Sequence, residues 1–170
     1  MRRWLPHIGI VLGIGIAIYA LFFASSEEDR IRARLEQLED AVLVTADDTN
    51  FLVRTGHVKK EFSEIFTKEV SIEIPELTEI SAGRDELVTL AAGAPRLYRT
   101  ANVDLGGLSI QIDKSETSAV AYGDATLTAT RPTGELQRDT RTVSLRFDKI
   151  DGEWRIVGVS VSAPEQSAQP

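Results

Sequence analysis

The chain contains no cysteine and only two histidines among its 170 residues. Without cysteine it can form neither a disulfide nor a thiolate metal site, and it has no thiol nucleophile. Basic side chains are the minority, with 19 lysines and arginines against 26 aspartates and glutamates and a net charge of −7. Because nucleic-acid binding needs a basic patch, this balance argues against nucleic acid as a partner. No glycine-rich phosphate loop or metal-ligand cluster is recognisable, so we expect neither a cofactor nor a metal.

Charge is also missing from one long stretch near the N-terminus. The 18 residues 6–23 carry no charged side chain, and a helix of that length spans about 27 Å, close to the ~30 Å core of a bilayer. We therefore expect a short cytoplasmic tail, 1–4, and a transmembrane helix, 5–23, that crosses the inner (cytoplasmic) membrane once and leaves the rest of the chain outside the cytoplasm. The alternative is a cleaved signal peptide with small residues at 24–26, although the apolar run exceeds the about 7–15 residues of a typical signal core.

Small residues recur every four positions within this predicted membrane helix, at Gly9, Gly13 and Ala17. Such a ridge lets two helices approach closely in lipid, which predicts helix–helix packing. The alternative interpretation is that glycine and alanine are simply common in membrane helices.

Two amphipathic helices are predicted after the membrane segment. In the first, 27–44, Ser26 is a suitable N-cap, and four apolar residues fall on one stripe: Ile31, Leu35, Leu38 and Val42. The second lies within 51–66, where Gly56 weakens the first part. Its apolar face consists of Val58, Phe62, Ile65 and Phe66.

A strand and a third helix follow. Alternation of Val70, Ile72 and Ile74 predicts a strand that Pro75 ends. The third helix begins at Arg84, and Pro95 limits its ordered part to about Ala94. Its predicted apolar face consists of Leu87, Leu90, Ala91, Ala94 and Leu97.

From Ala101 onward the chain has the pattern of antiparallel strands, over 108–112, 117–130 and a long hairpin within 141–163. Asp151-Gly152 is a strong hairpin-turn signal between the two arms of that hairpin. In the second arm the apolar phase changes beside Gly158, which indicates a bulge. We expect the polar tail 164–170 to be disordered.

The order of these elements resembles the nuclear transport factor 2-like (SnoaL-like, cystatin-like fold) superfamily. Besides Phe66, three local sequences carry the resemblance: 73–75 (Glu-Ile-Pro), 83–87 (Gly-Arg-Asp-Glu-Leu) and 151–156 (Asp-Gly-Glu-Trp-Arg-Ile). The resemblance covers about 29–163 and implies an α+β domain, which we place at 24–163. Its expected form is a cone of about three helices packed on a strongly curved, mostly antiparallel sheet, often with a pocket at the mouth.

The resemblance also provides a test for catalysis. In the similar ketosteroid isomerases, one catalytic Asp precedes the proline of the first strand and a second, protonated Asp lies four positions before the Phe that closes a later strand. The corresponding residues here are Ile74 and Val143, which cannot transfer a proton. A dehydratase-type His–Asp pair would need a second histidine in the domain, where His57 is alone. We therefore assign no catalytic residue.

Five residues are candidates to line a pocket at the mouth of the cone: His57, Tyr98, Asp104, Tyr122 and Asp124. Solvated positions or positions on a sheet face are the alternative for each of them.

Two functions are consistent with these features. The first is a membrane-anchored, non-catalytic interaction or scaffold module facing the periplasm or cell exterior, with protein partners or further copies of the chain. Its architecture is similar to that of inner-membrane scaffold subunits of type IV secretion systems and accessory membrane proteins of lipid importers. The alternative is a tethered small-molecule binder or isomerase/dehydratase-like enzyme. A deep apolar pocket with convergent polar groups would favour the alternative, and a filled cone would favour the first function.

Overall fold

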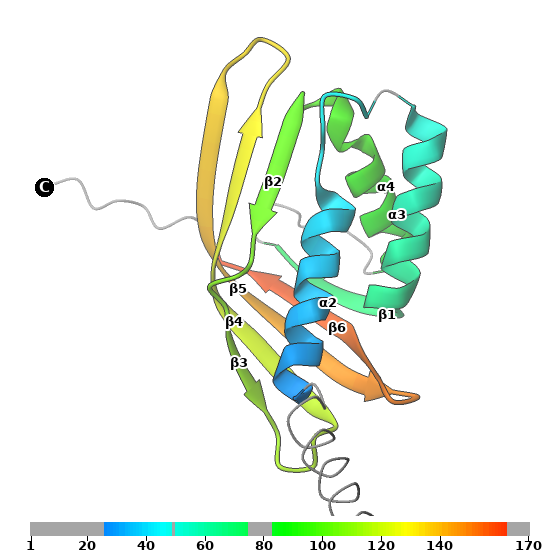
Figure 1. Ribbon diagram of the computed structural model, residues 1–170, viewed down its shortest axis with the longest axis vertical. Helices are drawn as coiled ribbons and strands as arrows, with labels where there is room; N and C mark the ends of the chain where they lie inside the picture. Colours follow the sequence, from blue (N-terminus) through cyan, green and yellow to red (C-terminus); the bar gives the residue numbers. More distant parts are fainter. Residues whose placement is uncertain (1–25, 49, 75–82, 163–170) are drawn as a thin grey trace, which may run out of the picture.

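The computed structural model describes residues 26–48, 50–74 and 83–162 (Figure 1). The predicted tail 1–4, the predicted transmembrane helix 5–23 with its Gly9, Gly13 and Ala17 ridge, and the predicted tail 164–170 all lie outside these ranges. Within the described ranges, no helix is both long enough and apolar enough to cross a bilayer.

The first described helix, α2, spans Glu27–Val42 and begins where the sequence predicts it. Ser26 and Asp29 form a reciprocal capping box, in which each side chain accepts a hydrogen bond from the backbone N–H of the other residue. This arrangement satisfies amide groups that have no partner within the helix. Ile31 and Leu35 are buried, which confirms the predicted apolar stripe at its centre.

Helix α3 spans Phe51–Ile65, and Asn50 caps it by accepting hydrogen bonds from the amides of Leu52 and Val53. Its buried stripe contains Val58, Phe62 and Ile65, as predicted, and begins with a residue that the sequence reading did not include, Arg54. The position fits the helical period, because Arg54 precedes Val58 by four residues.

Helix α4 spans Arg84–Gly93 and continues into a short 3₁₀ turn, η1, at Ala94–Arg96. The predicted apolar face is wrong in part: Val88 and Ala92 are the buried residues, whereas Leu90 is 50% exposed and Leu97 is 65% exposed. Leu90 lies two positions from Val88, about 200° around the helix, and therefore points away from the core. Leu97 follows η1, where the α-helical period no longer applies.

Six strands form one sheet in the described part of the chain. They are β1 (Phe66–Glu73), β2 (Thr100–Asp104), β3 (Ser109–Ile112), β4 (Ser118–Thr130), β5 (Leu136–Ile150) and β6 (Glu153–Val161). The order is β1-β6-β5-β4-β2, and β3 also pairs with β4. Only the β1–β6 pair among them is parallel, so the sheet is mostly antiparallel, as predicted.

The β5–β6 hairpin has the predicted turn and the predicted bulge. Asp151 and Gly152 both have positive φ angles, +53° and +82°, as a tight two-residue hairpin turn requires. Further along, Phe147 pairs with Ile156 but Arg146 pairs with Gly158, so Val157 is the extra residue of a bulge. The guanidinium of Arg146 lies where a side chain at Gly158 would be, which explains why this position suits glycine.

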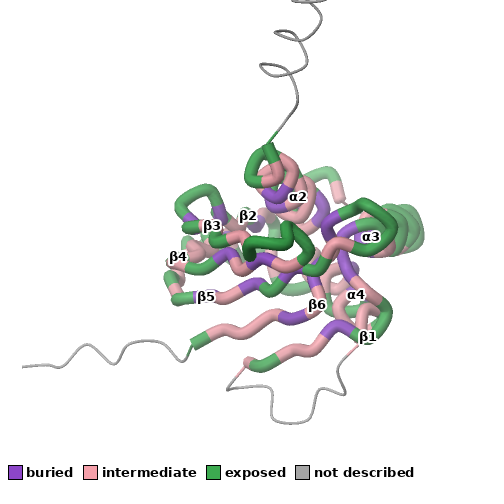
Figure 2. The backbone as a smooth tube through the Cα atoms, turned by 90° about the horizontal axis from the view of Figure 1, so that it is seen from below, coloured by how far each residue is buried: buried purple, intermediate pink, exposed green. Residues whose placement is uncertain are grey.

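The three helices cover one face of the curved sheet, and the other face is open (Figures 1 and 2). Between the two layers lies the main core, whose largest fully buried side chains include Trp154, Phe147, Ile31 and Ile65. The expected α+β architecture, with about three helices on a strongly curved sheet, is therefore confirmed for the described residues.

Candidate functional site

The resemblance to ketosteroid isomerases directs attention to two positions, Val143 and Ile74. Val143 is 8% exposed on β5, where it pairs with Gly123 of β4 and Val161 of β6. Ile74 directly follows β1 and is half-buried. Two and four residues further along β5, Leu145 and Phe147 are also buried. Aliphatic and aromatic groups thus form this part of the core.

Polar groups are almost absent from the core of the described ranges. Arg54 is the only polar or charged residue among them that is buried. In the same ranges no three histidine, aspartate or glutamate side chains are grouped so that they could hold a metal ion. The interior therefore provides an apolar environment without a group that can exchange a proton near neutral pH.

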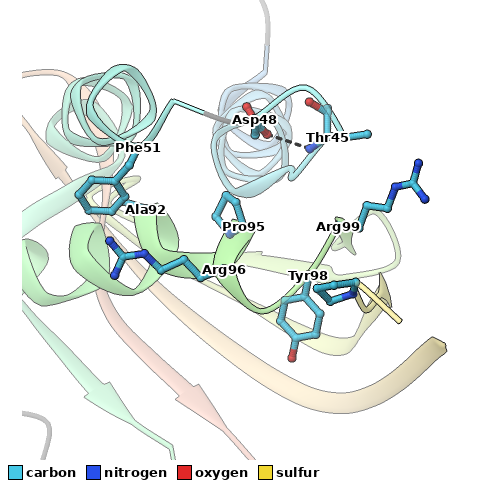
Figure 3. Close-up of a pocket in the computed structure, with 10 residues that line it drawn as sticks. Thr45, Asp48, Phe51, Ala92, Pro95, Arg96, Tyr98 and Arg99 are labelled. Carbon is cyan, nitrogen blue, oxygen red and sulfur yellow. Dashed lines mark hydrogen bonds between the residues drawn. The ribbon is translucent and has the colours of Figure 1, made fainter. Parts of the chain in front are cut away.

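A cavity of about 600 Å³ lies outside this core, at the end of the domain where α3 begins (Figure 3). It is formed by the α2–α3 loop, the first turn of α3, the end of α4 with η1, and the β4–β5 turn. Its lining residues are Thr45, Ala46, Asp48, Phe51, Ala92, Pro95, Arg96, Tyr98, Arg99 and Pro132.

Arg54 fixes one wall of this cavity. Its guanidinium donates hydrogen bonds to Asp48 Oδ2 at 3.0 Å, to the carbonyl of Leu43 at 3.0 Å and to the carbonyl of Ala91 at 3.2 Å. Asp48 also accepts a 2.8 Å hydrogen bond from the amide of Thr45. The Asp48 carboxylate thus ties the α2–α3 loop to the first turn of α3.

Two arginines and two aromatic rings give the cavity its chemical character. The guanidinium of Arg96 lies 4.7 Å from the centroid of the Phe51 ring, a cation–π contact that connects η1 to α3. Arg99 extends from the other side of η1, and the Tyr98 ring points away from Arg99 (Figure 3). The cavity can therefore accept a group that combines negative charge with apolar surface.

The five predicted pocket residues lie in three different places. Tyr98 lines the cavity, whereas His57 is exposed on α3. Asp104, Tyr122 and Asp124 all project from the open face of the sheet. There Asp104 accepts a 3.0 Å hydrogen bond from the amide of Gly106, and Asp124 accepts a 2.9 Å bond from the hydroxyl of Thr142. A separate shallow hollow of about 370 Å³ on this face includes Tyr122, Ser144 and Ser160.

Sequence reasoning missed two residues that organise the structure. The burial of Arg54 could have been recognised from the sequence, because Arg54 lies four residues before Val58 and so continues the spacing of the buried stripe of α3. Glu27 has a local partner in Arg30 at 3.0 Å, but its two other partners are remote in sequence and give no signal: the ammonium of Lys149 lies 2.8 Å away and the indole N–H of Trp154 donates a 2.6 Å hydrogen bond. These donors, Lys149 foremost, lower the pKa of Glu27 to about 2.

A second carboxylate with a low pKa closes the β3–β4 turn. Asp113 accepts hydrogen bonds from the hydroxyl of Ser115 and from the amides of Thr117 and Ser118. The Ser115 hydroxyl and the Ser118 amide are the main causes that lower the pKa of Asp113 to about 2. Since this group is fully exposed in a turn, its role is local turn formation.

Taken together, the helices, the curved sheet and the core define a cone-shaped α+β domain. The SnoaL-like domain family matches residues 37–159, which is well over half of the chain. The chain belongs to this SnoaL-like family, and the resemblance to the nuclear transport factor 2-like superfamily is confirmed. No curated protein sequence matches the chain.

Several solved structures share the fold. A nuclear transport factor 2-like superfamily protein from Salmonella enterica is 21% identical with a TM-score of 0.63, covering 83% of this chain and 93% of its own. The association domain of C. elegans CaMKII is 16% identical with a TM-score of 0.58, covering 80% and 94%. A protein assigned as a scytalone dehydratase from Novosphingobium aromaticivorans is 12% identical with a TM-score of 0.62, covering 85% and 95%. At these identities the likeness concerns the fold alone, and the fold serves both an association domain and an assigned enzyme.

Proposed function

We propose that the chain is a membrane-tethered, non-catalytic interaction module. Residues 5–23 cross the inner membrane, and the SnoaL-like domain lies outside the cytoplasm, where it binds other proteins or further copies of the chain. The observation that carries the proposal is the apolar core of the described residues, in which Arg54 is the only polar or charged residue that is buried. By the resemblance, Val143 stands where ketosteroid isomerases place a protonated aspartate, and the next inward-facing residues of its strand, Leu145 and Phe147, are buried apolar groups.

An enzyme of this size needs a concave pocket in which a few polar groups converge on the substrate. The buried core of the described residues supplies the apolar groups but no such convergent polar groups. A surface that binds proteins needs no such interior, because rigid elements that present exposed groups are sufficient.

The proposed location rests on the uncharged run 6–23 and on the position of α2. Helix α2 begins at Glu27, shortly after this run, so the end of the domain that contains the first turn of α2 would lie next to the bilayer. That turn carries three acidic residues: Glu27, Glu28 and Asp29. Two of these carboxylates are paired with basic side chains, Glu27 with Arg30 and Lys149 and Glu28 with Arg32.

The anchor is tested by fractionation. Full-length protein should sediment with membranes and resist extraction with alkaline carbonate, whereas residues 25–170 alone should stay in the soluble fraction. Mass spectrometry of the mature N-terminus provides the control. A mature chain that begins at 25–27 would contradict the anchor and indicate a cleaved signal peptide.

The non-catalytic role is tested on full-length protein in detergent. We expect native mass spectrometry to show no retained small molecule, and a panel of steroid, polyketide and small dehydratase substrates to show no turnover above background. The same panel is repeated with His57→Ala, Tyr98→Phe and Asp124→Asn. Turnover that any one of these changes abolishes would contradict the proposal and give that residue a catalytic role.

The second candidate function is a tethered small-molecule binder or isomerase/dehydratase-like enzyme. One observation favours it, the cavity of about 600 Å³ with the Tyr98 ring and two arginines in its lining. Its signature would be a retained anionic ligand that Tyr98→Phe or Arg99→Ala releases. Native mass spectrometry distinguishes the two candidates. A small-molecule binder shows the added mass of the ligand, which these variants lose, whereas a protein-binding surface shows no such added mass.

A further inference from the structure

Large apolar side chains are exposed around the cavity at the α3 end of the domain. Leu52 is 79% exposed, Val53 68% and Leu97 65%, and Phe51 beside them is also exposed. Single exposed apolar residues are ordinary, but several around one hollow mark a surface used for binding. We call this surface the distal tip and define it as Phe51, Leu52, Val53, Arg96, Leu97 and Arg99.

The distal tip is held rigidly, although its side chains are exposed. Asn50 caps the first turn of α3 through the amides of Leu52 and Val53, at 3.1 and 3.2 Å. The next residue, Arg54, is buried and joins this turn to the loop at Asp48 and to the end of α4 at Ala91. A surface whose groups are already fixed loses little entropy when a partner binds.

The distal tip as defined carries two arginines, and the adjoining α2–α3 loop contributes two acidic residues, the exposed Asp47 and Asp48, which pairs with Arg54. The ion pairs at this end of the described structure are Arg54–Asp48 and Arg131–Glu135, and neither Arg96 nor Arg99 takes part in one. The whole chain, in contrast, carries a net charge of −7. A complementary partner therefore combines apolar side chains with carboxylates.

The position of the distal tip favours a protein rather than the chain's own membrane. The tip lies at the opposite end of α2 from Glu27, which is four positions after the last residue of the proposed anchor (Figure 1). With 16 residues, α2 extends about 24 Å at ~1.5 Å per residue. The distal tip is thus directed away from the bilayer in which residues 5–23 are proposed to lie.

We infer that the distal tip is the docking surface for an acidic, amphipathic segment of a partner protein. The apolar side chains of that segment cover Leu52, Val53 and Leu97, and its carboxylates pair with Arg96 and Arg99. The inference rests on the proposed function as an interaction module, to which it adds the surface and the chemistry of the partner.

The first step of the test is site-specific photocrosslinking in the cells that naturally make the protein. A benzophenone amino acid replaces Leu52, Val53 or Leu97 in the full-length chain, one at a time. The control positions are Tyr122 and Thr140 on the open sheet face. We expect a discrete protein adduct from the tip positions, and mass spectrometry should locate the crosslink in a segment with more aspartate and glutamate than lysine and arginine.

The second step measures affinity with that segment as a synthetic peptide and full-length protein in detergent. Arg96→Glu/Arg99→Glu should raise the Kd about tenfold or more, since two attractive charges become repulsive. Lys68→Glu/Lys114→Glu, which changes the net charge equally at exposed positions away from the tip, should change the Kd less than about twofold. Rising salt should weaken binding to the wild type and strengthen it in the Arg96→Glu/Arg99→Glu variant.

Several results would overturn the inference. They are a crosslink to lipid or to another copy of this chain, a crosslinked segment that is basic, equal effects of the two double variants, and no adduct at the tip above the control positions. A protein adduct from Tyr122 or Thr140 alone would overturn the tip assignment but leave the interaction-module function standing. Turnover in the substrate panel would overturn that function independently of where the chain crosslinks.

Discussion

The indole N–H of Trp154 donates a hydrogen bond of 2.6 Å to the carboxylate of Glu27, which lies 127 positions earlier in the chain. The ammonium of Lys149, on the neighbouring strand, lies 2.8 Å from the same carboxylate. Both strands of the β5–β6 hairpin therefore hold the first turn of α2.

The Glu27 contact predicts a specific dependence of stability on pH. Lys149, with smaller contributions from Trp154 and Arg30, lowers the pKa of Glu27 from 4.5 to about 2 in the folded protein. The folded-state pKa lies below the unfolded one, so the stabilisation is complete above pH ~4.5 and is lost as the pH falls toward 2. Glu27→Gln should therefore be less stable than wild type at pH 7, and this difference should shrink toward pH 3.

Urea unfolding followed by circular dichroism at pH 7 and pH 3 measures this difference. Glu28→Gln is the matched control, because Glu28 lies in the same turn and its ion pair with Arg32 is largely exposed. Such a pair contributes only about 0.2–1 kcal/mol. A Glu27→Gln effect that is the same at both pH values would show that the carboxylate is not held by these donors.

Packing at the centre of the hairpin gives the second prediction. Phe147 and Trp154 are fully buried on the inner side of β5 and β6. Phe147→Ala and Trp154→Ala should each lower the free energy of unfolding by about 3–5 kcal/mol. Leu136→Ala, on the same strand as Phe147 but 70% exposed, should change it by less than about 0.5 kcal/mol. Thermal melts that do not separate these variants would show that the strand register is wrong.

The hairpin also shows why the sequence predicted most of the fold. The turn at Asp151-Gly152 and the bulge beside Gly158 follow from local rules, because residues adjacent in sequence determine them. The stripe of α3 follows from helical periodicity in the same way. The face of α4 was mispredicted at Leu90, because that helix has apolar residues on several sides and only its packing against α3 and β1 selects one.

The candidate site was much less predictable. The cavity is assembled from three stretches of sequence, within 45–51, within 92–99 and at Pro132, that meet through the fold. Tyr98 is the only one of the five predicted pocket residues among them. Asp104, Tyr122 and Asp124 lie on the open sheet face, and a polar residue on a strand gives no local sign of which face it will occupy when both faces contain small or polar side chains. Arg54 had a periodic signal, but an arginine at a buried helical position is rare enough to be overlooked.

Arg54 gives the third prediction. Its side chain, 6% exposed, donates to the carbonyls of Leu43 and Ala91 and to Asp48. Arg54→Met keeps the apolar part of the side chain but removes these hydrogen bonds and leaves Asp48 without its ion-pair partner, which should cost about 1–3 kcal/mol. Arg54→Lys should recover only part of the lost stability, because an ammonium cannot reproduce the forked geometry of a guanidinium.

Chemical denaturation measures both variants, and Arg131→Met, at an exposed ion pair, is the control. Equal stability of Arg54→Met and Arg131→Met would contradict the proposal that the hydrogen bonds of Arg54 hold the elements of the distal tip together.

The last prediction concerns the position where related isomerases place a protonated aspartate. Val143→Asp introduces a carboxyl group at a site that is 8% exposed and faces buried apolar side chains. Burial raises the pKa of such a group, so its folded-state pKa exceeds the unfolded value of about 3.9. The loss of unfolding free energy that comes from the charge should therefore be small below pH ~4. It should grow to several kcal/mol as the pH rises, because the carboxyl group then ionises readily only in the unfolded chain. Val143→Asn is the matched control. Its side chain has nearly the same shape as that of aspartate and no charge, so its stability relative to wild type should not depend on pH.

Unfolding of both variants at pH 4 and pH 8 separates the effect of the charge from the effect of the changed shape and polarity. If Val143→Asp were as stable as Val143→Asn at pH 8, the interior would already contain donors that stabilise a carboxylate. That result would favour the small-molecule function over the interaction module.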